Sequence, residues 1–236
     1  MIRILIPIGL LVAGGIVHLM LSRRNEKKVQ AEWAVLLSPS SERVFQQARM
    51  EVESHTSMID VAVTEAREIR QLGNVEEAVR FLNIGCDIIH RFTPNLLSLL
   101  AVMTRFSRMV SAIAPITPIV PGDFHLAELT NLARLNRLLH HMLASAKQRF
   151  RLKLYILGKG LSLTSQYLIR TIGNIVSGRS HEEREWDEVV DITQDFQKLS
   201  NESVLSLRVL LEALSSDAAK ELSRTISLPQ PHSSHD

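Results

Sequence analysis

An uncharged apolar stretch near the start of the chain constrains the fold most. Residues Ile4 to Leu21 form eighteen consecutive positions without a charged side chain. At a rise of about 1.5 Å per residue, a helix of this length spans roughly 27 Å, close to the thickness of the bilayer hydrocarbon. The stretch is apolar around its whole circumference and offers no amphipathic face to a water-soluble core. It predicts a single transmembrane helix, with residues 1–28 as the anchor.

Three other interpretations of this stretch are open. A cleaved signal peptide needs a site of the small-x-small type, which residues 18–21 do not provide. A lipoprotein signal needs a cysteine where Gly15 stands. A buried core helix is the third alternative, and the terminal position of the stretch favours the anchor over it.

The charges that flank the stretch predict its orientation. Four basic residues follow it, Arg23, Arg24, Lys27 and Lys28, whereas only Arg3 and the amino terminus precede it. Because basic loops stay in the cytoplasm, the larger part of the chain is expected on the cytoplasmic side. The same basic residues would lie against anionic lipid headgroups.

The rest of the chain has the periodicity of helices and predicts an all-α fold. Hydrophobic residues make up 45% and charged residues 22% of the sequence, which is ordinary for a globular domain. We expect an antiparallel bundle of about five to six helices after the anchor. The expected divisions are helical hairpins over 29–114, a proline-rich linker over 115–122, a long charged hairpin over 123–228 and a disordered tail over 229–236.

A heptad pattern marks the first part of this region. Apolar or small residues recur at alternating steps of three and four, which is typical of a helix packed along one seam. His55 is the one polar interruption, and no second metal ligand lies four residues away. Whether this seam is covered within the chain or by a partner stays open. The seam residues are Phe45, Ala48, Val52, His55, Ile59, Ala62, Ala66 and Ile69.

Capping signals predict where several helices begin and end. Gly73 is expected to terminate one helix, and Asn74 with Glu77 is typical of the start of the next. Residues 93–94 (Thr-Pro) predict the end of that helix and the start of another. A register skip at residues 200–203 predicts a break or a stutter in the last long helix.

Leucine-rich periodicity from Leu132 to Leu161, extended to Ile175, predicts one long helix that begins near Asp123. The helix is expected to continue past the glycines at 158 and 160 or to resume after a kink. Alternation of charged and apolar residues over 149–153 would also suit a strand, but a lone strand lacks a partner.

Part of the first hairpin resembles the second half of a tetratricopeptide repeat. The resemblance rests on Gly73, Val75, Ala78, Leu82 and Pro94 and covers about twenty residues. Gly85 stands where that family prefers alanine, and no second copy follows at the repeat period. The resemblance implies an antiparallel helical hairpin.

Charge is segregated along the second half of the chain. Nine basic residues and no acidic residue lie between Leu129 and Ser180, whereas eleven acids and four bases lie between His181 and Ser223. The two segments are expected to attract one another as arms of a hairpin; alternatively, the basic helix faces anionic lipid. Few aromatic residues argue against nucleic acid. The basic set is Arg134, Arg137, Lys147, Arg149, Arg151, Lys153, Lys159, Arg170 and Arg179.

Motifs for catalysis or cofactor binding fail on inspection. The glycines around Lys159 lack the remaining residues of a phosphate loop. His140 and His141 are adjacent, so on a helix they point about 100° apart and cannot share a metal. Cys86 is the single cysteine and excludes an internal disulfide. We therefore expect neither an enzyme nor a bound cofactor or metal.

These features favour a single-pass membrane protein whose helical domain binds another protein. The expected role is that of an adaptor, tether or assembly factor on the cytosolic side, with homo-oligomers possible. The alternative is a protein that binds anionic lipid or remodels membranes through the basic helix 134–159.

Overall fold

The described part of the chain consists of helices and the turns between them. The computed structural model describes residues 41–111, 113, 131, 134, 137, 145–179 and 183–226, with side chains up to residue 217. The helices are α2 (Ser41–Gln71), α3 (Val75–Phe106), α5 (Ala146–Val176) and α6 (Glu183–Ile226). No strand occurs among these residues, so the prediction of an all-α helical bundle is confirmed.

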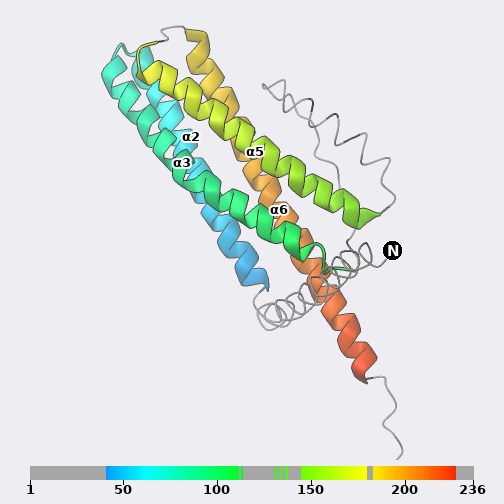
Figure 1. Cartoon of the computed structure of the whole chain (residues 1–236). Helices are drawn as coiled ribbons and strands as arrows, with labels where there is room; N and C mark the ends of the chain where they lie inside the picture. The colour runs from blue at the N-terminus through cyan, green and yellow to red at the C-terminus, as the bar shows by residue number, and fades with distance from the viewer. Residues whose placement is uncertain are drawn as a thin grey trace, which may run out of the picture. The chain divides into compact units, whose positions relative to one another are not determined.

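The chain divides into two units, Met1–Ser41 and Glu42–Asp236, and the bundle belongs to the second. In this unit α2 and α3 form an antiparallel hairpin (Figure 1), in which the Cβ position of Gly85 on α3 lies 3.6 Å from the Cβ of Ala62 on α2. A methyl group at this position would make an ordinary van der Waals contact with α2, so the two helices lie at normal packing distance here.

The pairs α3–α5, α5–α6 and α2–α6 are also antiparallel. Lys147, at the start of α5, donates a hydrogen bond to the carbonyl of Arg108, just after α3. Early in α5, Lys153 pairs with Glu202 near the middle of α6, and later in α5 Tyr167 donates to Glu188 near the start of α6. Late in α2, Arg67 pairs with Asp187 at the start of α6, which closes the ring of four helices.

All four helices contribute to one core. Ile59, Leu82, Leu154 and Ile192 come from α2, α3, α5 and α6, and each is at most 1% exposed. Segments expected as separate hairpins, 29–114 and 123–228, therefore supply helices to the same bundle.

Within the described residues there are four helices, so the prediction of about five to six is wrong for this part of the chain. One reason is that Pro94 lies inside α3 and does not end it. Pro94 removes the hydrogen bond to the carbonyl of His90, and both residues are exposed, where water can replace that bond. Phe92 and Leu96, on either side of the proline, are buried in the core and favour an uninterrupted helix.

Residues 200–203 were predicted to hold a break or a stutter, and the break is excluded because α6 continues through them. Ser200 and Ser203 are fully buried and continue the core-facing stripe between Phe196 and Leu207. Their hydroxyls donate to the carbonyls four residues earlier, at 2.7 and 2.8 Å. The skip in hydrophobic register therefore marks small polar residues in the core of a continuous helix.

The long helix predicted from Asp123 onward is interrupted at Ser145. Ser145 has an extended backbone (φ −99°, ψ 134°), and its side chain accepts a hydrogen bond from the amide of Gln148 at the start of α5. From Ala146 the helix runs without a break through Gly158 and Gly160. The strand alternative for 149–153 is thereby excluded.

Local capping signals are confirmed where the structure describes them. Gly73 has a φ of +86° between α2 and α3, in the left-handed region that glycine adopts without strain. Asn74 caps α3 by accepting from the amide of Glu77 at 3.2 Å. Gly178 (φ +67°) follows α5 in the same way.

Several predictions fall outside the described residues: the anchor over 1–28 with Arg23, Arg24, Lys27 and Lys28, the linker over 115–122 and the tail over 229–236. Across the helices that the structure does describe, none combines the length and apolarity needed to span a membrane.

Candidate partner-binding surfaces

The heptad seam of α2 faces the interior of the bundle. Five of its eight residues are buried, and the other three, Ala48, His55 and Ile69, are half-buried. His55 stacks on Phe92 of α3 with ring centroids 4.6 Å apart. The seam is thus covered within the chain and is not the surface that a partner would meet.

The basic residues of α5 divide into different environments. Lys153 is buried, and its ammonium lies 2.9 Å from the carboxylate of Glu202, so at this position the basic helix faces the acidic one. Lys159 is exposed, as are Arg134 and Arg137 at their helical positions. The predicted basic set therefore does not form one surface.

The first turns of α5 hold three basic residues in a partly dehydrated setting. Burial and the nearby charge of Arg151 lower the pKa of Lys147, with a smaller opposing effect of Asp217. The Nε atoms of Arg149 and Arg151 are buried and have no hydrogen-bond partner in the described part of the chain. No acidic residue lies in the first turn of α5, where the helix dipole favours one.

The interface of α5 with α6 carries further polar contacts. The hydroxyl of Tyr167 donates to Glu188 at 3.0 Å. At the same end of the bundle, the guanidinium of Arg70 lies over the ring of Trp186, 4.9 Å from its centroid. These two contacts join side chains of neighbouring helices to each other, so we assign them to the packing of the bundle.

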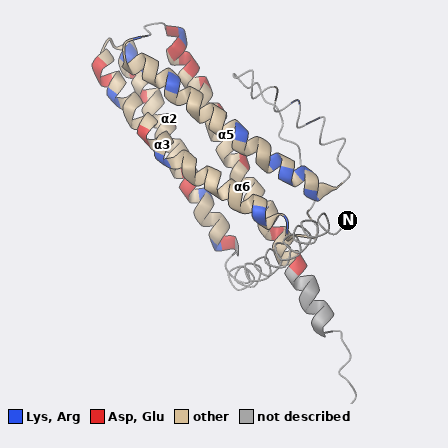
Figure 2. Cartoon of the chain, in the orientation of Figure 1, with Lys and Arg blue, Asp and Glu red and all other residues tan. Residues whose placement is uncertain are grey.

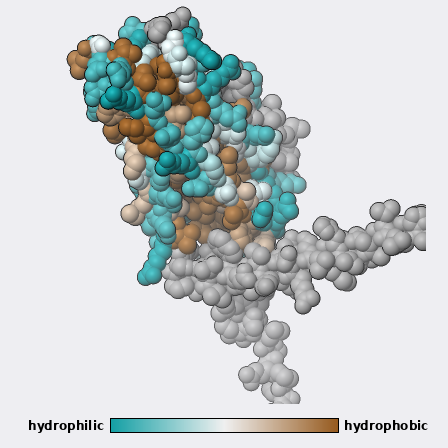
Figure 3. Space-filling model, turned by 60° about the vertical axis from the view of Figure 1, so that its left-hand side comes forward, coloured by the Kyte–Doolittle hydropathy of each residue, from teal (hydrophilic) through white to brown (hydrophobic). Residues whose placement is uncertain are grey.

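Sequence reasoning missed an exposed apolar surface on the α2–α3 hairpin. We call it the hairpin face, and it consists of Met58, Val61, Leu72 and Ile84, each of which is more than half exposed. Figure 3 turns the α2–α3 side of the bundle forward and shows hydrophobic residues gathered over the end where the two helices connect. Exposed apolar groups that gather in this way commonly mark a binding surface.

Val61 and Ile84 lie beside a contact between the two helices. Each is the chain neighbour of a residue in that contact, Ala62 on α2 and Gly85 on α3. A signal for this surface was present in the sequence: Met58, Val61 and Leu72 follow helical spacing on the side of α2 opposite the seam.

Acidic residues border the hairpin face. Glu65 and Glu68 share its stripe on α2, and Asp87 follows Ile84 by three residues on α3. All three are exposed and make no ion pair with any described residue. Figure 2, in which Asp and Glu positions are red on the ribbon, shows several acidic positions at this end of the bundle.

Cys86 lies between Gly85 and Asp87. It is half-buried, and burial together with the charge of Asp87 raises the pKa of its thiol. A raised pKa keeps the thiol protonated and poorly nucleophilic at neutral pH. In the described ranges, no group of three or more His, Cys, Asp or Glu residues is arranged to hold a metal ion.

Comparison of the chain with protein-family models, with curated proteins and with solved structures gave no match.

Proposed function

We propose that this chain is a membrane-tethered helical adaptor that binds a protein partner through the hairpin face. The observation that carries the proposal is the exposure of Val61 and Ile84, at 54% and 52%, beside the contact of Ala62 on α2 with Gly85 on α3. The heptad seam is used inside the bundle, whereas the apolar side chains of the hairpin face remain exposed and are available to a partner. Binding, rather than catalysis, is the activity it suits.

Site-specific photo-cross-linking tests the surface. The full-length chain, carrying p-benzoylphenylalanine in place of Val61, is irradiated in the cells that produce it. We expect a protein adduct of defined mass, and we expect Ile84→Asp to abolish it, since a charge within the apolar surface disfavours docking.

Tyr155 on α5 provides the matched control because it is a large exposed side chain, at 57%, on a different helix. A probe at this position should form no adduct of that mass. Equal labelling from Val61 and Tyr155, or an adduct that persists in the Ile84→Asp variant, would contradict a specific surface.

The tether is proposed from the sequence, on the uncharged residues 4–21 and the basic residues that follow them. We expect the chain to resist extraction from membranes at alkaline pH. Replacing Leu11 and Val12 with arginine should release it, because each arginine at the centre of a span costs about 3 kcal/mol on insertion scales. If the natural chain is extracted from membranes at alkaline pH, the proposed tether is contradicted. The proposal about the hairpin face does not depend on that result.

A second candidate function is binding of anionic lipid near the start of α5. It is favoured by the basic residues gathered there, since the Nε atoms of Arg149 and Arg151 are buried without a hydrogen-bond partner in the described part of the chain. Burial, together with the charge of Arg151, also lowers the pKa of the neighbouring Lys147. Titration with dihexanoyl phosphatidylglycerol below its micellar concentration should show saturable binding that Arg151→Glu weakens. Equal binding of dihexanoyl phosphatidylcholine would exclude this function.

A further inference from the structure

We propose that the partner of the hairpin face presents an amphipathic helix with an apolar stripe flanked by lysine or arginine. This inference rests on the proposed function and names the chemistry of the partner. Helices commonly dock with apolar side chains at steps of three and four against a surface of matching spacing.

The spacing of the exposed side chains on α2 suits such a helix. Met58, Val61, Glu65, Glu68 and Leu72 follow one another at steps of three, four, three and four, which is one face of a helix. From Met58 to Leu72 the stripe is about 21 Å long at 1.5 Å per residue. An occupant of about four turns would cover it, and the flexible side chain of Met58 can adapt to its shape.

Two basic residues near the hairpin face, Arg67 on α2 and Arg80 on α3, are already engaged. Arg67 pairs with Asp187 of α6 at 2.6 Å, and Arg80 pairs with Glu76 at 2.9 Å. Glu65 and Glu68 keep their charges without such partners in the described part of the chain. The hairpin face therefore combines apolar side chains with unneutralised negative charge.

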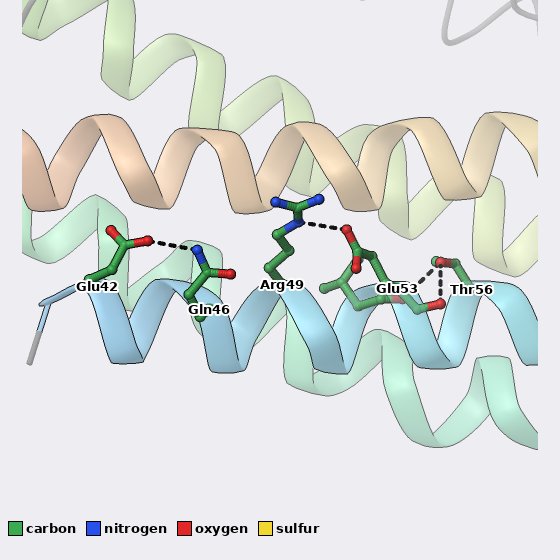
Figure 4. A network of polar contacts seen from close by, with 6 residues as sticks. Glu42, Gln46, Arg49, Glu53 and Thr56 are labelled. Atoms are coloured by element: carbon green, nitrogen blue, oxygen red, sulfur yellow. Dashed lines mark hydrogen bonds and ion pairs between the residues drawn. The ribbon is translucent and has the colours of Figure 1, made fainter.

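The first half of α2 shows that the helix can neutralise its acids locally. There the guanidinium of Arg49 pairs with Glu53 at 2.6 Å, whereas the uncharged amide of Gln46 only donates a hydrogen bond to Glu42, also at 2.6 Å (Figure 4). No basic residue stands four positions before Glu65 or Glu68, where Val61 and Thr64 lie instead. Glu65 and Glu68 therefore keep their charge at the hairpin end of α2, beside the exposed apolar side chains of the hairpin face.

Charge decides between the possible occupants. In a symmetric dimer the same surface meets itself, so Glu65, Glu68 and Asp87 would face their own copies and repel. Anionic lipid headgroups would be repelled for the same reason. A helix with basic flanks gains attraction from these carboxylates while its apolar stripe covers Val61 and Ile84.

The test uses two synthetic eighteen-residue peptides with the same leucine pattern and either lysine or glutamate at every polar position. Each is labelled and titrated with the full-length chain in phosphatidylcholine nanodiscs, and empty discs serve as the blank. We expect the lysine peptide to bind at least about tenfold more tightly than the glutamate peptide and to weaken as salt is raised, because screening reduces the attraction.

Charge-reversal variants locate the attraction. Glu65→Lys combined with Glu68→Lys should weaken the lysine peptide about tenfold. The matched control, Glu42→Lys with Glu51→Lys, makes the same change on exposed positions of the same helix outside the hairpin face and should leave affinity unchanged. Circular dichroism should show the same melting temperature for both double variants.

The outcomes separate this inference from the proposed function. Equal affinity for the two peptides, or an unchanged affinity of the lysine peptide for the Glu65/Glu68 variant, overturns the inference that the partner helix is basic. Sequencing the peptide cross-linked at Val61 gives an independent result: a segment rich in lysine or arginine supports it, while an acidic segment, a second copy or the chain's own residues overturn it. Absence of any Val61 adduct is a failure of the proposed function itself.

Discussion

The ammonium of Lys153 on α5 lies 2.9 Å from the carboxylate of Glu202 on α6, and the two side chains are 7% and 31% exposed. The pair joins the basic and acidic helices at a point where one charge is buried and the other still reaches solvent. The buried ammonium of Lys153 depends on its counterion, whereas the carboxylate of Glu202 is still partly solvated by water and depends less on the pair.

Removing the acid should therefore cost more than removing the base. Glu202→Gln leaves a buried ammonium without a counterion and should lower the free energy of unfolding by about 2 kcal/mol, whereas Lys153→Met should cost less than about 1 kcal/mol. Glu212→Gln, which breaks the exposed pair with Arg208, is the control and should stay within about 0.5 kcal/mol. Equal losses for Glu202→Gln and Glu212→Gln in thermal unfolding followed by circular dichroism would show that the burial does not matter.

Two glycines should respond oppositely to the same substitution. Gly85→Ala places a methyl group 3.6 Å from Ala62, an ordinary contact, and should stabilise α3 by about 0.5–1 kcal/mol. Gly73→Ala meets no neighbour, but the φ of +86° disfavours a side chain and should cost about 1 kcal/mol. The melting temperature should rise in the first variant and fall in the second; a shift of the same sign in both would contradict the backbone argument.

Thr164 on α5 has a fully buried hydroxyl with no hydrogen-bond partner among the described residues. Thr164→Val replaces that hydroxyl with a methyl group of similar size and should stabilise the bundle by about 1 kcal/mol, since an unsatisfied polar group is removed. Thr193→Val is the control because its hydroxyl already donates to the carbonyl of Val189 at 2.7 Å. A gain that is no larger at Thr164 than at Thr193 would indicate that the first hydroxyl is satisfied.

The thiol of Cys86 should react slowly with iodoacetamide at neutral pH. Burial and the charge of Asp87 raise the pKa of this thiol, so the reactive thiolate should form only at a higher pH than an ordinary cysteine requires. Because the folded-state pKa is raised, this group supports folding at neutral pH, and that contribution is lost as the pH rises through the folded pKa. Asp87→Asn should move the rate profile to lower pH, while Asp60→Asn on α2 should not; an unshifted profile in Asp87→Asn would exclude its charge as a cause.

Local signals in the sequence predicted the helical class and several helix ends. Gly73 and Asn74 act through their own backbone and side chains, so their roles follow from the residues next to them. Ser145 is of the same kind: its side chain caps α5 at Gln148, and the capping pattern was visible but outweighed by the leucine periodicity around it.

Other positions depended on packing that no local pattern contains. Pro94 and the serines at 200 and 203 are helix-disfavouring residues, and neighbours on other helices hold them in α3 and α6. Lys153 and the apolar Val61 show the same dependence, since the charged residue is buried and the apolar one is exposed.

The sequence by itself determined that this chain forms helices, where the turn at residues 73–74 falls, and that residues 45–69 carry a core-facing stripe. Only the tertiary structure decided that this stripe is used up inside the chain and that Met58, Val61 and Ile84 are left at the surface. The physical reason is that helical periodicity sets the angles between side chains on one helix, whereas burial depends on which other helix occupies each side.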